Sequence, residues 1–143
     1  MPIPPRSRVS ARSRRSPDGA TGRTAKLVQP GRPVVACVGD GSFLMTVGEI
    51  NTAVRLRLPI VFVVLRDNLL SLIKVRQMRK HLPPYGIQLL DSHYRSSDNF
   101  FGAGVIAVHD EESFREAFKK GLEGNEPLII EAVVDPSEYE MLI

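Results

Sequence analysis

Two short runs of Val, Ile and other apolar residues each end at a turn that contains an Asp. The first run, Val34–Val38, is followed closely by Asp40, and the second, Ile60–Leu65, by Asp67. Runs that are apolar on both faces and stop at turn residues are typical of buried parallel strands. The segment between them has helical spacing, which indicates a strand–helix–strand unit with a right-handed crossover. The sequence therefore predicts an α/β fold, a parallel sheet with helices on both faces.

Asp40 and Asp67 are predicted to converge at one edge of this sheet. The carboxyl ends of parallel strands share an edge, where α/β proteins bind ligands. Gly39 and Gly41 flank Asp40 and would let the backbone approach a ligand closely, and the next N–H groups would lie at a helix N-terminus that favours phosphate. Mg²⁺ prefers oxygen ligands and would relieve the repulsion between two carboxylates and a diphosphate. The leading interpretation is a metal and anion site; the alternative is two simple turns.

These residues also carry a resemblance to a known family. Gly39-Asp40-Gly41-Ser42, followed at this spacing by Asp67-Asn68, resembles the signature of thiamine-diphosphate-dependent enzymes, and Glu49–Arg55 and Leu58-Pro59 are similar to the family as well. The resemblance covers about residues 25–140. It points to the C-terminal, diphosphate-binding domain of the acetolactate synthase and benzoylformate decarboxylase branch. It implies the thiamine-diphosphate-binding fold, with its N-terminal part incomplete here.

The resemblance also implies cofactors and their ligands. Thiamine diphosphate and Mg²⁺ are expected, whereas FAD, which some synthases carry, would come only with a full-length relative. Asp40, Asp67 and the main-chain carbonyl of Leu69 would hold the metal. The implied cofactor-binding residues are Gly39, Asp40, Gly41, Ser42, Asp67 and Leu69, with Gly41 and Ser42 donating to the diphosphate.

This sequence departs from the family pattern next to the implied metal ligands. Many relatives have Asn-Asn where this chain has Arg66-Asp67, although an Asp at the ligand position is similar to the catabolic acetolactate synthases. Leu69 stands where Gly is usual, so any need for a positive φ there would cost energy.

Residues 70–79 are predicted to form a helix over the cleft. By similarity, Leu72, Ile73 and Arg76 would lie near the reacting end of the cofactor, although Leu72 and Ile73 could equally be core residues. Residues 81–86 are predicted to be a loop, part of an active-site lid in relatives. No complete catalytic set is expected in this chain, because the family's activating Glu lies on a separate pyrimidine-binding domain.

The implied function is that of an acetolactate-synthase-like enzyme acting on small 2-oxo acids by decarboxylation and carboligation, in branched-chain amino acid biosynthesis. The pyrimidine-binding domain would come from a homo-oligomer or from another chain, so whether this chain is itself an enzyme stays open. The alternatives are a catalytically silent truncated fragment and a benzoylformate-type 2-oxo acid decarboxylase. Dinucleotide binding is disfavoured, because no G-x-G-x-x-G opens the first helix.

The net charge is divided unevenly along the chain. Residues 1–33 carry eight Arg or Lys and one acid, a net +7, whereas the other 110 residues carry −4. Because the basic segment is rich in Ser and Pro and lacks periodicity, residues 1–25 are predicted to be a disordered arm and residues 26–143 the domain. A transit peptide and a nucleic-acid-binding arm are alternatives, the latter disfavoured because no aromatic residues interleave with the Arg residues. A truncated or shifted reading frame, which would make the arm foreign to the domain, is preferred.

Length and composition limit the remaining classes. A chain of 143 residues with 43% apolar residues can bury one core. The single Cys, Cys37, excludes a disulfide framework and is predicted to be buried within its strand. The reducing cytosol is the default compartment for such a chain, so a cytoplasmic protein is expected. No apolar stretch approaches the length of a membrane span, so no membrane segment is expected. The three His residues show no metal-ligand spacing.

The other elements are predicted from spacing and turn residues. Thr46 and Glu49 form a predicted capping box for a helix that turns Val47, Ile50, Val54 and Leu58 toward the sheet. The remaining predictions are a helix over 93–101, a strand over 105–108, a helix over 111–122 capped by Asp110 with the stripe Phe114, Ala117, Phe118 and Leu122, and a strand over 127–134.

Overall fold

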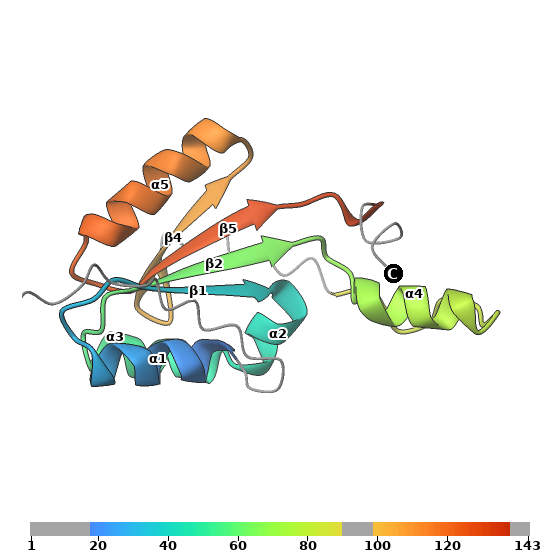
Figure 1. Cartoon of the computed structure of the whole chain (residues 1–143). Helices are drawn as coiled ribbons and strands as arrows, with labels where there is room; N and C mark the ends of the chain where they lie inside the picture. The colour runs from blue at the N-terminus through green and yellow to red at the C-terminus, as the bar shows by residue number, and fades with distance from the viewer. Residues whose placement is uncertain (1–17, 90–98, 138–143) are drawn as a thin grey trace, which may run out of the picture.

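A mostly parallel, five-stranded sheet forms the centre of the molecule (Figure 1). The computed structural model describes residues 18–89 and 99–137, and within them the strand order is β1-β2-β5-β4-β3. Strands β1, β2, β5 and β4 are parallel, and β3 is antiparallel to β4. The strands are β1 (Val34–Gly39), β2 (Ile60–Arg66), β3 (Asn99–Phe100), β4 (Ala103–Val108) and β5 (Leu128–Val133). The predicted α/β class is confirmed.

Helices cover both faces of the sheet. Helices α1 (Asp18–Val28), α2 (Asp40–Met45) and α3 (Gly48–Arg55) lie on one face and α5 (Glu111–Glu123) on the other, while α4 (Ser71–Arg79) extends beyond the edge (Figure 1). Strand β2 is buried on both faces of the sheet. Phe62 and Val64 pack in the core under α2 and α3, and Val61 and Val63 pack under α5. This two-sided burial is why β2 reads as a continuous apolar run.

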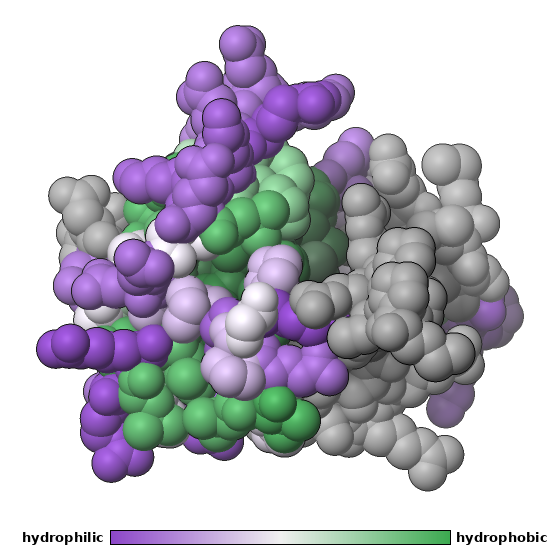
Figure 2. All heavy atoms as spheres, turned by 60° about the vertical axis from the view of Figure 1, so that its left-hand side comes forward, coloured by the Kyte–Doolittle hydropathy of each residue, from purple (hydrophilic) through white to green (hydrophobic). Residues whose placement is uncertain are grey.

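Helix α5 begins and packs largely as predicted. The Asp110 side chain accepts from the Ser113 N–H at 2.7 Å, and the Ser113 hydroxyl reaches back to the Asp110 N–H, which completes a capping box. Phe114 and Phe118 stack with ring centroids 5.6 Å apart and pack against the core. The predicted place of Leu122 is wrong: it is 42% exposed, and the helix approaches the sheet at buried Gly121 instead. Figure 2 shows hydrophilic side chains over the outer surface of α5 and hydrophobic ones gathered below it.

The predicted capping box at Thr46 is wrong. The Thr46 hydroxyl instead donates to the Ser42 and Phe43 carbonyls and so closes α2. Helix α3 starts after Val47 without a side-chain cap, and Glu49 pairs with Arg23 of α1 at 2.5 Å. Two short helices, not one, therefore connect β1 to β2. The stripe itself is confirmed, because Ile50 is buried and Val47, Val54 and Leu58 pack against the same core.

Helix α1 begins within the segment that is predicted to be a disordered arm. It begins at Asp18, so the prediction of disorder is wrong for residues 18–25; residues 1–17 lie outside the described part. Gly22 allows close packing on β1, since a Cβ there would lie 3.3 Å from the Ala36 Cβ. The buried Lys26 ammonium donates to the carbonyls of Pro30 (2.9 Å) and Arg32 (2.7 Å), which closes the turn into β1. Tertiary contacts, not an apolar stripe, hold this helix.

Two other sequence predictions need correction. Cys37 is exposed on the edge strand β1, whereas α5 packs mainly on β2, β4 and β5. Asn99 and Phe100 form β3, so the end of the predicted helix over 93–101 is wrong, while residues 93–98 lie outside the described ranges. The other predicted strands agree with β4 and β5. In the described parts of the chain no helix is both long and apolar enough to cross a membrane.

The cap of α5 predicts a pH dependence of stability. The Ser113 amide and hydroxyl lower the pKa of Asp110 below its ordinary value of 3.8. The stabilisation is therefore fully present above the unfolded-state pKa and is lost as the pH falls through the lower folded-state pKa. Asp110→Asn keeps a capping oxygen but cannot titrate. We expect the melting temperature of the native chain to exceed that of Asp110→Asn by more at pH 7 than near pH 3.

A matched control is Glu126→Gln, which removes an exposed acid before β5. Thermal denaturation followed by circular dichroism at both pH values measures the differences. An equal difference for Asp110→Asn at the two pH values would contradict the role of the charged cap.

Candidate functional site

Asp40 is a buried carboxylate that joins the ends of β1 and β2. It is 6% exposed and begins α2 directly after β1. Its Oδ1 accepts from the Gly41 N–H at 2.7 Å, and its Oδ2 accepts from the N–H groups of Asn68 (2.9 Å) and Asp67 (3.3 Å). The turn after β2 therefore wraps around the acid that follows β1, at the carboxyl edge of the sheet.

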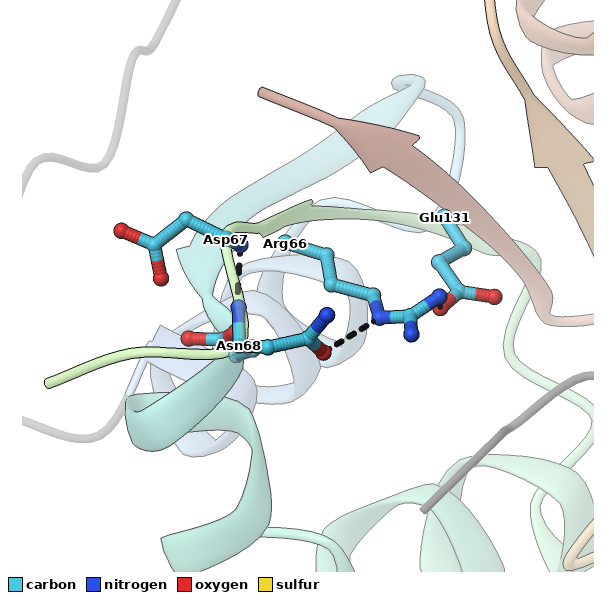
Figure 3. A network of polar contacts seen from close by, with 5 residues as sticks. Arg66, Asp67, Asn68 and Glu131 are labelled. Atoms are coloured by element: carbon cyan, nitrogen blue, oxygen red, sulfur yellow. Dashed lines mark hydrogen bonds and ion pairs between the residues drawn. The ribbon is translucent and has the colours of Figure 1, made fainter. Parts of the chain in front are cut away.

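Asp67 belongs to that turn and uses its side chain to hold it. Its Oδ1 accepts from the Leu69 N–H at 2.9 Å, and its Oδ2 accepts from the Ser71 hydroxyl at 2.5 Å. Ser71 is the first residue of α4, so Asp67 connects the turn to this helix. In Figure 3 the Asp67 carboxylate points away from the guanidinium of Arg66. The two acids that the sequence singles out thus lie at one sheet edge, each already orienting backbone N–H groups.

The positive φ in this turn falls on Asn68 and not on Leu69. Asn68 has φ 59°, a conformation that Asn tolerates better than Leu. Leu69 forms a β-bridge with Gln88, and the Leu89 N–H donates to the Asn68 carbonyl at 3.0 Å. The strain considered for Leu69 is therefore absent.

The glycines at the turn differ in what surrounds them. A Cβ on Gly41 would lie 2.8 Å from Leu70 Cδ2, so a larger residue would push against the start of α4. A Cβ on Gly39 would meet nothing within 4 Å, which leaves open space beside this turn. Ser42 is exposed on α2, and the Gly41 N–H is engaged by Asp40. Gly39, Gly41 and Ser42 thus surround Asp40 at the sheet edge.

Helix α4 presents the residues predicted to face the substrate. Leu72 is 57% exposed and Ile73 is 45% exposed, and Arg76 is exposed too. Only Ser71 and Val75 of this helix are buried. The alternative that Leu72 and Ile73 are core residues is wrong, because α4 extends past the sheet edge (Figure 1).

A buried ion pair behind the turn was not predicted. Arg66 Nη1 donates to Glu131 Oε1 at 2.9 Å, and the two side chains are 6% and 0% exposed. Arg66 Nε also donates to Asn68 Oδ1 at 2.7 Å (Figure 3). The available signal was Glu131 itself, a charged residue inside an otherwise apolar strand, since such residues are rarely buried without a partner.

The described residues contain no cluster of three or more His, Cys, Asp or Glu side chains that could hold a metal ion. A site here would therefore combine two carboxylates with main-chain and ligand oxygens. Such a hard oxygen set fits Mg²⁺, which typically uses one or two carboxylates together with substrate phosphates.

The parallel sheet with two acidic turns at its carboxyl edge defines an α/β ligand-binding domain. The family model "Thiamine pyrophosphate enzyme, C-terminal TPP binding domain" matches residues 17–132. The chain belongs to this family of thiamine-pyrophosphate-binding domains. The match begins at residue 17, so the expected start of the resemblance at about residue 25 is wrong.

Individual relatives agree with this assignment. The chain is 32% identical over 114 residues to an acetolactate synthase of Bacillus subtilis, covering 80% of this chain and 20% of the relative. It is 28% identical over 119 residues to a catabolic acetolactate synthase of Raoultella terrigena, covering 83% of this chain and 21% of that protein. The chain thus spans about a fifth of the length of these relatives.

Solved structures support the fold. Benzoylformate decarboxylase from Polynucleobacter necessarius superposes with a TM-score of 0.74 at 21% identity, covering 83% of this chain and 23% of the other. A thiamine diphosphate-dependent 4-hydroxybenzoylformate decarboxylase of Rhodococcus jostii RHA1 gives a TM-score of 0.73 at 23% identity, covering 80% and 22%. At these identities the likeness concerns the fold alone.

The hydrogen bonds at Asp40 predict a large cost for removing it. Asp40→Ala removes the acceptor of three N–H groups at a buried position, so the free energy of unfolding should fall by about 3 kcal/mol. Asp67→Ala is the matched comparison, since Asp67 is only half-buried and water can replace its oxygens; a loss of about 1 kcal/mol is expected. Urea unfolding without ligands measures both. A smaller loss for Asp40→Ala than for Asp67→Ala would contradict the bridging role of Asp40.

Proposed function

We propose that this domain binds the diphosphate end of thiamine diphosphate through Mg²⁺, as part of an acetolactate-synthase-like enzyme that acts on 2-oxo acids by decarboxylation and carboligation. The observation that carries the proposal is the bond between Asp40 and the Asp67–Asn68 turn. It holds both acids at the sheet edge beside the open space at Gly39. Family membership supports the cofactor, and the hard oxygen donors support the metal.

The hydrogen bonds already made by the two acids leave room for one metal ion. A carboxylate has about four lone-pair sites. Asp40 accepts three N–H groups, which leaves about one site, and Asp67 accepts two groups. Each acid could thus bind an ion through one oxygen, and the Leu69 carbonyl would supply a third ligand. The fixed N–H groups would keep the acids in place before the metal arrives, which lowers the cost of binding.

Gly39, Gly41 and Ser42 would lie against the diphosphate in this arrangement. The bound cofactor supplies the chemistry that breaks and forms bonds next to a carbonyl group, and the chain supplies position and electrostatics. Leu72, Ile73 and Arg76 would line the substrate side, where the Arg76 cation suits the carboxylate of a 2-oxo acid.

A partner domain is part of the proposal. Exposed apolar side chains gather on α4 and in the loop that follows it, and exposed apolar patches commonly mark interaction surfaces. They are Leu72, Ile73, Met78, Leu82 and Tyr85, the last 85% exposed. A pyrimidine-binding domain, from a second copy of a longer chain or from another subunit, would cover them.

A thermal-shift experiment tests the cofactor site. With Mg²⁺ and thiamine diphosphate at 100 times the dissociation constant, the native chain should gain about 2.7 kcal/mol, or roughly 5–11 °C in melting temperature. Asp67→Ala should abolish the gain because it removes a metal ligand. The control is Asp110→Ala, which removes the Asp that caps α5. This variant should still gain stability from the cofactor and Mg²⁺.

Chelation separates the metal from the cofactor in the same experiment. Adding EDTA should remove the gain from the native chain, since the diphosphate would then face two carboxylates without a cation. A native chain that shows no shift with cofactor and Mg²⁺ would overturn the proposal and favour a silent fragment. A shift that survives EDTA would overturn the role of the metal.

A further inference from the structure

A buried charged network stands directly behind the turn that contains Asp67. Strand β2 pairs with β5 so that Val64 is opposite Glu131 and Arg66 is opposite Val133. Arg66 and Glu131 are therefore diagonal neighbours on one face of the sheet, which lets Arg66 Nη1 reach Glu131 Oε1 at 2.9 Å. Both side chains are more than nine-tenths buried.

Stability alone does not explain such a pair. The cost of removing two charges from water commonly offsets their attraction, and apolar residues of similar size are often as good or better. Charges in such a place are better justified when they fix the position of another group. Arg66 has a planar guanidinium with several donors in a rigid fork, so one edge can bind Glu131 while another reaches a second acceptor.

That second acceptor is the side chain of Asn68. Arg66 Nε donates to Asn68 Oδ1 at 2.7 Å, across a turn in which Asn68 has φ 59°. In this conformation the Asn68 N–H meets Asp40 Oδ2 at 2.9 Å. The contacts from Glu131 through Arg66 to Asn68 can be followed in Figure 3, and the Asn68 N–H continues them to the carboxylate of Asp40.

Backbone bonds hold the other side of the same turn. The Leu70 N–H donates to the Ile87 carbonyl at 2.7 Å, and the Leu89 N–H donates to the Asn68 carbonyl at 3.0 Å. These bonds pair the turn with residues 87–89 but do not involve the Asn68 side chain. The Asp67 side chain holds the turn as well, through the Leu69 N–H and the Ser71 hydroxyl, so the contact with Arg66 is the one described constraint that acts on the Asn68 side chain.

We propose that Arg66, held by Glu131, is a positioning residue that sets the Asp67–Leu69 turn through the side chain of Asn68. The network acts on the metal site without touching it: it aims two N–H groups at Asp40 and so fixes where Asp67 and Leu69 can meet an ion. The consequence for metal affinity rests on the proposed function, whereas the positioning of the turn does not.

Asn68→Gly tests this role with little other disturbance. Glycine adopts a positive φ without steric cost, so the variant removes the acceptor of Arg66 and leaves the backbone conformation accessible. The matched control is Asn99→Gly in β3, at the opposite edge of the sheet from β1. It removes a side-chain oxygen that accepts from the Gly102 N–H at 2.7 Å across the turn that follows β3. Both changes add similar freedom to the unfolded chain.

Two measurements on the full chain separate positioning from general stability. In Asn68→Gly the Asp67 and Asn68 amides should exchange hydrogen about tenfold faster without ligands, since the constraint on their bonds to Asp40 is lost. Mg²⁺ affinity, measured by calorimetry with thiamine diphosphate present, should fall about tenfold, as for other groups that orient metal ligands. Asn99→Gly should leave the exchange rates of these amides and the Mg²⁺ affinity within about twofold of the native values. It should lower the melting temperature about as much as Asn68→Gly does.

Asn68→Asp serves as the conservative variant. It keeps an acceptor for Arg66 and tolerates the positive φ, so the slow exchange of the Asp67 and Asn68 amides should return. The positioning role would be overturned if the Asp67 and Asn68 amides exchanged at the native rate in Asn68→Gly. It would also be overturned if Asn99→Gly accelerated their exchange as much as Asn68→Gly does. If the native chain fails to bind Mg²⁺ and thiamine diphosphate, the proposed function fails, while the exchange rates still decide the role of Arg66.

Discussion

The bond between the Asp40 carboxylate and the Asp67–Asn68 turn is the contact on which the site depends. A carboxylate that is 6% exposed needs compensating hydrogen bonds, and it finds them in the N–H groups that follow the neighbouring strand. The requirement to satisfy one buried charge therefore holds the ends of β1 and β2 together. It also explains how acids from two separate turns come to share the edge where α/β proteins bind ligands.

Local signals were sufficient for much of the fold. The strands β1, β2, β4 and β5 follow from apolar runs bounded by turn residues, and the start of α5 follows from Asp110, because these features depend on neighbours in sequence. The errors arise where distant contacts decide. Helix α1 packs at Gly22 against Ala36 of β1, and the exposure of Cys37 depends on which strands α5 covers. The capping box failed because Thr46 serves the end of α2.

In the candidate site, too, some features follow from local sequence signals and others from distant contacts. Its acids could be found from sequence because Gly, Asp and Asn after apolar runs have a local meaning. Leu69 stands where Gly is usual, which raises the question of a positive φ there, but Asn68, the residue better suited to that conformation, adopts it. The pairing of Arg66 with Glu131 spans 65 residues and appears only once β2 and β5 are adjacent. The exposure of Leu72 and Ile73 likewise follows from the direction of α4, which the pattern of residues 70–79 does not fix.

Helix α4 connects the interior of the domain with the surface that a partner would cover. Its first residue, Ser71, donates to Asp67 at 2.5 Å, while Leu72 and Ile73, the next two residues, are exposed. A domain that packed on those apolar side chains would restrict α4, and through Ser71 it would restrict the carboxylate of Asp67. The turn is thus held from two directions, by Arg66 from within the sheet and by α4 from outside. About four-fifths of the length of the acetolactate synthases that this chain matches lies outside the matched region, so a longer relative has further chain that could pack on α4.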